Sequence, residues 1–235
     1  MEKQLRAIRS WVRREGRLTE GQENALRNLW PTLGITASDQ PINAEKLFGR
    51  KAPLILEIGF GNGLSLAAMA KAHPENDYIG AEVYLPGVGS LLHRIQAAEL
   101  TNLRLFHGDA TDFLQQQIPD QSLHAVYLFF PDPWPKRKHH KRRILQPSFI
   151  HLLWKKLAPD GIFHMATDWE HYARHMLKVM DADSGYCNQA GAGHFSPRPE
   201  YRPLTKFEQR GVNLGHQVKD LIFVRKSPSS DSTEK

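Results

Sequence analysis

Cysteine is almost absent from this chain of 235 residues, since Cys187 is its one occurrence. A single cysteine excludes an internal disulfide and a zinc site built from thiolates, and it is typical of proteins in a reducing compartment. Apolar runs are short, and none approaches the ~20 residues that a membrane-spanning helix needs. The charged N-terminus also lacks the apolar segment of a secretory signal. We therefore expect a cytoplasmic protein with no membrane partner.

Metal-binding patterns are missing as well. The twelve histidines are scattered along the chain. The adjacent pair His139 and His140 lacks the i, i+4 spacing with which two histidines on one helix hold a metal ion. We expect no metal site.

Basic residues, by contrast, are in excess, with a formal net charge of +6 and a pI near 9.4. This balance permits a polyanionic partner without requiring one. Arg6, Arg9, Arg13 and Arg17 recur at intervals of three or four, so a helix would align them on one stripe. Two interpretations stay open for this N-terminal arm: a solvated helix face, or a surface that binds phosphates.

Short apolar runs and helical patterns alternate from Pro53 onward. Such alternation predicts an α/β fold, with a mostly parallel, twisted, Rossmann-like sheet and helices on both of its faces. The run Asp220–Val224 predicts a late antiparallel strand. The other strands are expected at 54–58, 78–83, 103–106, 124–130 and 161–166, and the helices at about 63–73, 87–99, 111–117, 143–157 and 169–181.

The flanking regions differ in pattern. Thr19 or Glu20 is expected to cap a helix that runs to Trp30 and ends before Pro31. The expected organisation is a basic arm and connecting segment over 1–50, a main domain over 51–226 and a disordered tail over 227–235. We also expect a connecting loop over 31–50, and over 183–216 a segment that runs across the protein surface.

The strand expected at Leu54–Ile58 runs directly into a Gly59–Gly63 turn with glycine at every other position. Glycine lacks a Cβ, so the chain can turn sharply there and a ligand can approach its backbone. The dinucleotide fingerprint G-x-G-x-x-G needs a third glycine where this chain has Leu64. The carboxylate of Glu57 would repel a pyrophosphate but attract the ammonium group of S-adenosylmethionine. The turn therefore favours S-adenosylmethionine as the cofactor.

Two further acids follow the next two expected strands. Glu82 lies about twenty residues after the glycine turn, where an acid can accept both ribose hydroxyls. Asp109 follows the third strand and can accept the amino group of adenine. Each acid has a simpler alternative, a solvent-facing strand end for Glu82 and a helix cap for Asp109. Because ligands of open α/β sheets bind at the strand tips, the acids together favour a cofactor site.

The fourth expected strand runs into the segment Phe129–Lys136, in which prolines alternate with other residues. The prolines stiffen the backbone and hold Asp132, Trp134 and Lys136 in fixed relation. Residues 136–143 are all basic or histidine, and such a run of like charge is self-repulsive without an anion. RNA phosphates would supply that anion, and Trp134 offers a stacking face for a splayed base.

Taken in order, these motifs resemble those of the bacterial-type tRNA (guanine-N7-)-methyltransferase family of S-adenosylmethionine-dependent class I methyltransferases. The resemblance covers about residues 6–225, and its most specific part is Phe-Pro-Asp-Pro-Trp followed by Thr-Lys-Phe-Glu. Pro135 is a small departure, since some relatives carry histidine there. The motifs are Arg9–Arg13 with Gly16-Arg17, Glu57–Gly63, Pro86–Gly89, Phe129–Trp134, Ala166–Glu170 and Thr205–Gly211.

The resemblance implies methylation of guanine N7 in the variable loop of tRNA, at position 46, by a catalytic domain over 51–226. A tRNA partner is therefore expected, whereas monomer and homodimer both stay open. The cofactor contacts that it implies are Glu57, Gly59, Glu82, Asp109 and Asp132. The substrate contacts that it implies are Lys136, Asp168, Thr205, Lys206, Phe207 and Glu208.

Guanine N7 has an in-plane lone pair, so its methylation needs no general base, and most of the rate should come from alignment. Asp132 is the expected catalytic residue, either by binding the guanine N1–H and amine or by stabilising the developing positive charge. Asp168 is a second candidate for base recognition, with helix capping as its alternative. Lys206 and Arg210 are hypothesised phosphate or base contacts, and an internal ion pair competes as the role of Glu208 and Arg210.

Three other functions are weighed as alternatives. A nicotinamide-dependent oxidoreductase is disfavoured by Glu57 and the missing third glycine. A non-catalytic RNA-binding protein is disfavoured by acids at three strand tips, and a methyltransferase for proteins or small molecules by the basic run and arm.

Overall fold

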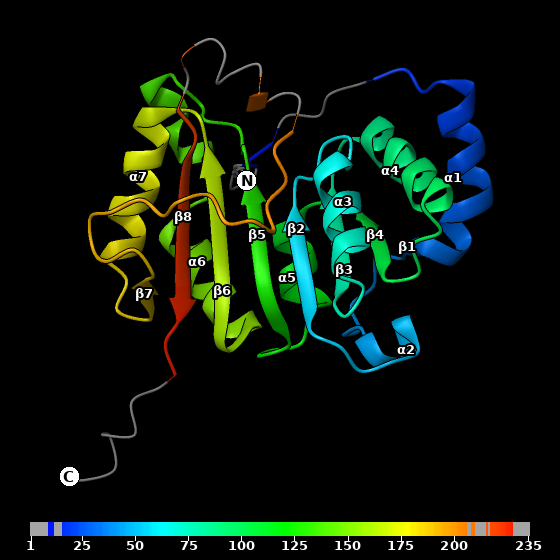
Figure 1. The fold of residues 1–235 in the computed structure, drawn as a ribbon, viewed down its shortest axis with the longest axis horizontal. Coiled ribbons are helices and arrows are strands. Elements are labelled where there is room, and N and C mark those ends of the chain that lie inside the picture. The colour runs from blue at the N-terminus through cyan, green and yellow to red at the C-terminus, as the bar shows by residue number, and fades with distance from the viewer. Residues whose placement is uncertain (1–8, 12–15, 206–207, 210–214, 216, 228–235) are drawn as a thin grey trace, which may run out of the picture.

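The computed structural model describes residues 9–11, 16–205, 208–209, 215 and 217–227. Its centre is a sheet of eight strands in the order β1-β4-β3-β2-β5-β6-β8-β7 (Figure 1). All neighbours are parallel except β8, which runs antiparallel to both β6 and β7. The strands are β1 Gly34–Ile35, β2 Leu54–Ile58, β3 Asp77–Glu82, β4 Leu103–His107, β5 Leu123–Phe129, β6 Leu157–Thr167, β7 Tyr186–Asn188 and β8 Lys219–Arg225.

Helices cover both faces of this sheet, as the alternating pattern predicts (Figure 1). Buried side chains of α1, α3 and α4 share one core cluster, and those of α5, α6 and α7 share the other. The helices are α1 Glu20–Leu33, α2 Ala44–Phe48, α3 Leu64–Ala72, α4 Leu85–Ala97, α5 Ala110–Gln116, α6 Pro147–Lys156 and α7 Glu170–Asp181, with a 3-10 turn η1 at Arg137–Arg142. No helix in the described part of the chain is both long and apolar enough to cross a membrane.

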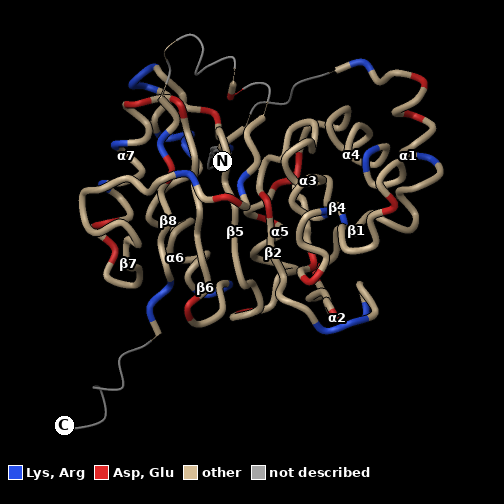
Figure 2. The backbone as a smooth tube through the Cα atoms, in the orientation of Figure 1, with Lys and Arg blue, Asp and Glu red and all other residues tan. Residues whose placement is uncertain are grey.

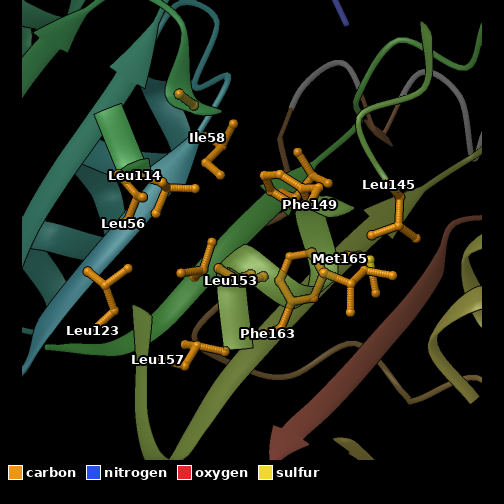
Figure 3. Packing of buried hydrophobic residues seen from close by; sticks show 14 of the residues in the cluster. Leu56, Ile58, Leu114, Leu123, Leu145, Phe149, Leu153, Leu157, Phe163 and Met165 are labelled. Carbon is orange, nitrogen blue, oxygen red and sulfur yellow. The ribbon is translucent and has the colours of Figure 1, made fainter. Parts of the chain in front are cut away.

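Strand β2 is buried along its whole length because it lies between two covered faces. Successive side chains of a strand point to opposite faces. Leu56 and Ile58 accordingly join the core against α5 and α6, whereas Ile55 packs in the cluster of α3 and α4. Figure 3 shows the first of these clusters, with Leu153 of α6 among its members. This packing holds the carboxyl end of β2, where the glycine turn begins.

The polarity of the sheet places several loops at one edge. Strands β5 and β6 point to the upper edge in Figure 1, and β8 points the opposite way. The order of the sheet changes direction at β2, which has β3 on one side and β5 on the other. Open α/β sheets bind ligands beside the carboxyl ends of the strands at such a switch point.

Residues 19–50 carry more regular structure than the sequence predicts. Thr19 caps α1 as expected, and its hydroxyl accepts from the backbone N–H of Gln22. The helix does not end before Pro31 but continues to Leu33, where Trp30 and Leu33 pack against the core. A proline in the final turn removes only one helical hydrogen bond, so packing can outweigh it. The loop expected over 31–50 is also wrong, since this segment carries β1 and α2.

Two other boundaries differ from expectation. The helix expected over 143–157 begins only at Pro147, because proline at the first helical position ends the hydrogen-bond ladder towards the N-terminus. Arg143 therefore lies in a connection between η1 and α6. The segment 183–216 is a surface excursion in part, but it contributes β7 at the edge of the sheet. The late antiparallel strand is confirmed as β8.

Candidate active site

A cavity of about 260 Å³ opens at the switch point, beside the carboxyl ends of β2, β3, β4 and β5. It combines a glycine turn, three acids and an aromatic wall. Its lining residues are Ser10, Trp11, Ile58, Gly59, Gly61, Ala81, Glu82, Val83, Tyr84, Gly108, Asp109, Ala110, Leu128, Phe129, Phe130, Pro131, Asp132 and Ile144. Four of the five residues expected to contact the cofactor, Gly59, Glu82, Asp109 and Asp132, therefore meet at one cavity.

The glycine turn presents bare backbone to this cavity. Gly59 and Gly61 have φ angles of 73° and 59°, which favour glycine, and a Cβ on either would meet no atom within 4 Å. The turn is supported from behind by α4, where a Cβ on Gly87 would lie 2.1 Å from the carbonyl oxygen of Gly61. The absence of side chains at these positions leaves room for a ligand and for the close approach of α4.

Glu82 is buried at the tip of β3 and also organises the turn. Its Oε2 accepts the backbone N–H of Gly61 at 2.8 Å. Its Oε1 accepts the backbone N–H groups of Val83 and Tyr84 at 2.7 and 2.9 Å. A carboxylate oxygen accepts more than one hydrogen bond, so these contacts hold the acid in place with capacity left for a ligand.

Asp109 is a helix cap, which is one of the two roles that the sequence left open, and it also lines the cavity. Its Oδ1 accepts the backbone N–H of Thr111 at 2.8 Å, and the residue caps α5. Its Oδ2 accepts the indole N–H of Trp11 at 2.7 Å. The cap fixes the carboxylate at the cavity, and the second bond brings a residue of the N-terminal arm to the same place.

Glu57 is the one expected cofactor residue that does not line the cavity, because it is 3% exposed within β2. Burial and the neighbouring Glu82 raise the pKa of Glu57 to about 8. The sequence predicts a negative charge here, but in the protein without ligand this acid is mostly protonated at pH 7. Its Oε2 has no hydrogen-bond partner among the described residues. An unpaired buried oxygen directly behind the glycine turn is a site at which a ligand cation can be bound.

Asp132 stands exposed on the proline-rich loop after β5, where it lines the cavity. Trp134, two residues on, is not the free stacking face that the sequence predicts. Its indole N–H donates to the carbonyl of Ser10 at 3.0 Å, the guanidinium of Arg142 lies 5.0 Å from its ring centroid, and His139 packs edge-on. Arg142 and His139 are near in the chain, but the contact with Ser10 joins residues 124 positions apart, which local sequence cannot reveal.

Most of the basic run folds as η1, where Arg137, Lys138 and Lys141 are exposed, whereas Arg143 beyond it is buried. Lys136 is exposed as well, and Figure 2 shows Lys and Arg gathered beside α7 at the same edge of the sheet. Desolvation and the nearby cations, Lys138 and Arg142 foremost, lower the pKa of His139. The cations of the run therefore lie close enough to repel one another, as the sequence predicts. The run also lies next to the loop that carries Asp132.

Asp168 follows the tip of β6 and is half-buried. Trp169, the next residue, caps α7 by backbone conformation and leaves 44% of its surface exposed. Asp168 lies at the same edge as Asp132, since β5 and β6 are parallel neighbours.

Thr205 and Glu208 belong to a turn that is tied to the sheet. Glu208 is buried, and both of its carboxylate oxygens accept from Arg202, at 2.7 and 2.8 Å. Arg202 also forms two hydrogen bonds to Asp220 of β8, at 2.7 and 2.9 Å. Burial alone would raise the pKa of Asp220, but hydrogen bonds from His164 and Arg202 hold it below its usual value. Glu208 therefore does form an internal ion pair, but with Arg202, whereas the pair expected with Arg210 lies outside the described residues.

The remaining expected substrate contacts lie outside the described residues. They are Lys206, Phe207 and Arg210. The arm residues Arg6 and Arg13 also lie outside the described residues. Within the described ranges, no group of three or more His, Cys, Asp or Glu side chains could hold a metal ion. Ser10 and Trp11 line the cavity although they precede β2 by more than forty residues, and the sequence did not predict this position for them.

The fold and the glycine-turn cavity define a class of protein, the methyltransferases. A family described as "Putative methyltransferase" matches residues 51–221. A solved structure with a similar fold is a variant of the 16S rRNA (adenine(1408)-N(1))-methyltransferase of Catenulisporales acidiphilia with its cosubstrate SAM. The TM-score is 0.55 with 14% identity, over 80% of this chain and 94% of that chain. At this identity the likeness concerns the fold alone.

Sequence relatives identify the family more narrowly. The tRNA (guanine-N(7)-)-methyltransferase of Hydrogenovibrio crunogenus is 59% identical, over 94% of this chain and 92% of its own length. That of Aeromonas hydrophila subsp. hydrophila is 58% identical, over 94% and 93%. The chain therefore belongs to the tRNA (guanine-N7-)-methyltransferase family, as its motifs indicate.

Proposed function

We propose that this protein transfers the methyl group of S-adenosylmethionine to N7 of a guanine in tRNA, with guanine 46 of the variable loop as the expected target. The observation that carries the proposal is that an acidic surface and a basic surface lie next to each other. The cavity gathers Glu82, Asp109 and Asp132, and the exposed cations of η1 begin five residues after Asp132. A cationic methyl donor fits the first surface and a phosphate backbone fits the second.

The cavity residues fit S-adenosylmethionine. The bare backbone at Gly59 and Gly61 leaves space for the methionine part, and the unpaired Oε2 of Glu57 is the proposed acceptor for its ammonium group. Glu82 and Asp109, both held by backbone N–H groups, are the proposed acceptors for the ribose hydroxyls and the adenine amine. When bound, this cofactor supplies an electrophilic methyl group on a sulfonium.

Guanine N7 attacks that methyl group with its own lone pair, so no residue has to remove a proton first. The task left to the protein is alignment and charge stabilisation. Asp132, exposed beside the cavity, is the proposed catalytic residue. Its carboxylate can accept from the guanine N1–H and amine, and it lies near a ring that becomes cationic during transfer. Asp168 is the proposed second contact with the base.

The remaining proposed contacts surround this centre. Lys136 and the following cations are proposed to bind phosphates, and Thr205, Lys206 and Phe207 to contact the tRNA. Glu208 is proposed to support the substrate site without touching the tRNA, because its carboxylate binds Arg202. Arg202 in turn binds Asp220, so the pair ties the turn to β8. The proposed enzyme works in the cytoplasm, where tRNA is found.

The test is incubation of the protein with methyl-labelled S-adenosylmethionine and unmodified tRNA, followed by digestion to nucleosides. The proposal predicts label in 7-methylguanosine, and sequencing of the tRNA should place it at position 46. Label in another nucleoside would contradict the chemistry, and label at another guanine would contradict the position alone.

A further inference from the structure

The loop that carries Asp132 is held in an unusual backbone conformation. Phe130 and Trp134, on either side of it, have φ angles of 51° and 44°, a region that favours glycine. Each such residue costs on the order of 1 kcal/mol and persists only where its surroundings enforce it. Prolines at 131 and 133 cannot donate backbone hydrogen bonds, so the loop has few donors of its own. The loop is held by the backbone N–H of Phe130, which donates to the carbonyl of Ala166 at 2.7 Å, and by side-chain contacts.

Arg143 is one such side chain. It is 1% exposed, although it directly follows the exposed cations of η1. Its Nε donates to the carbonyl of Pro133 at 2.9 Å, the residue next to Asp132. A buried guanidinium that binds the backbone of this loop does not serve as a surface cation, so Arg143 has a different task from its neighbours in the basic run.

The same guanidinium reaches the start of α7. One Nη lies 3.1 Å from Nδ1 of His171, and because arginine has no acceptor, that imidazole nitrogen accepts. The guanidinium carbon lies 4.7 Å from the ring centroid of Tyr172, a cation–π contact. His171 follows Asp168 by three residues along the chain. One planar group thus joins the loop of Asp132 to the helix that begins beside Asp168.

We infer that Arg143 is a positioning residue for methyl transfer, which fixes the Asp132 loop against the start of α7 and so sets the placement of Asp132 relative to Asp168. The inference rests on the proposed function, in which both aspartates contact the guanine. The planar guanidinium of arginine makes these three contacts in three different directions. Lysine has a single ammonium on a flexible chain and cannot make all three at once. Alignment errors of about 1 Å are enough to slow an enzyme ~100-fold.

The test compares Arg143→Lys with Arg174→Lys, a matched change at a residue of α7 that is 73% exposed. For Arg143→Lys we expect a 10- to 100-fold lower kcat at saturating tRNA and cofactor. The Kd for S-adenosylmethionine should stay within threefold, and Arg174→Lys should match the original protein in both. An unchanged kcat in Arg143→Lys, or a fall no larger than the loss of folded protein seen in thermal unfolding, overturns the inference.

A double-substitution cycle separates positioning from a general structural role. If Arg143 acts through Asp132, Arg143→Lys should cost less than threefold in an Asp132→Asn background, read by single-turnover transfer of labelled methyl. Should Asp132→Asn transfer no detectable label, Asp132→Glu replaces it in the cycle. An equal loss in both backgrounds rejects the inference. Absence of 7-methylguanosine with the unsubstituted protein is a different result, because it rejects the proposed function itself.

Discussion

Trp11 and Asp109 are separated by 98 positions in the sequence, and yet the indole N–H donates to Oδ2 of the carboxylate at 2.7 Å. Both residues line the cavity. Arg9 lies with its guanidinium 5.0 Å from the Trp11 ring centroid, so the arm brings positive charge to the same place. The N-terminal arm, for which the sequence left a solvated face and a phosphate-binding surface open, therefore forms part of the cavity wall.

Substitution of Trp11 tests this role. Trp11→Ala removes an apolar wall and a hydrogen bond worth about 1 kcal/mol, so the Kd for S-adenosylmethionine should rise roughly 5- to 10-fold. Trp11→Phe keeps an aromatic wall and loses only the hydrogen bond, so its Kd should rise by no more than about fivefold and less than that of Trp11→Ala. Isothermal titration without tRNA measures both. If Trp11→Ala binds the cofactor normally, the arm has no part in that site.

The buried acid Glu57 gives a prediction about stability and pH. Burial and Glu82 raise its pKa from 4.5 in the unfolded chain to about 8 in the folded protein. The folded protein therefore holds one more proton between these pH values. The stability that this proton gives is complete below pH 4.5 and is lost as the pH rises through about 8, with a slope of at most ~1.4 kcal/mol per pH unit.

Glu57→Gln cannot ionise and should remove that slope. The free energy of unfolding of Glu57→Gln minus that of the original protein should be larger at pH 8.5 than at pH 5.5. Urea denaturation at the two pH values measures this, with the exposed Glu75→Gln as the control. A difference between the two proteins that is the same at both pH values would show that Glu57 ionises normally.

The cations of η1 give a prediction about salt. Each phosphate contact releases counterions, so replacing one contacting lysine should reduce the slope of log K against log salt by about 1. We expect this for Lys141→Gln, measured as tRNA affinity over a range of salt concentrations. Lys51→Gln is the matched control, because Lys51 is exposed just before β2, at the opposite edge of the sheet from the carboxyl tips. Equal slopes for the two variants would remove η1 from the tRNA interface.

Much of this architecture follows from patterns that local sequence carries. The apolar run before Gly59 predicts β2 because a strand covered on both faces is apolar throughout. The acids Glu82 and Asp109 could be placed at strand tips for the same reason, and parallel strands bring those tips to one edge. These predictions succeed because they depend on residues close together in the chain.

The remainder depends on contacts between distant segments. Pro31 lies inside α1 because packing against the core outweighs a local helix-ending signal. Trp134 donates its indole N–H to the carbonyl of Ser10, 124 positions away, and no local pattern in the sequence indicates this contact. The protonation of Glu57 was missed although the sequence places this acid inside a buried strand, because that burial and the neighbouring Glu82 raise its pKa.

The most direct test of the account is the rate of methyl transfer by Asp132→Ala, measured as labelled 7-methylguanosine formed in tRNA at saturating cofactor. Because Asp132 is proposed to act on the guanine, we expect the rate to fall by at least about 100-fold, while the Kd for S-adenosylmethionine rises no more than about fivefold. Turnover equal to that of the original protein would contradict the central claim that this carboxylate aligns and stabilises the base.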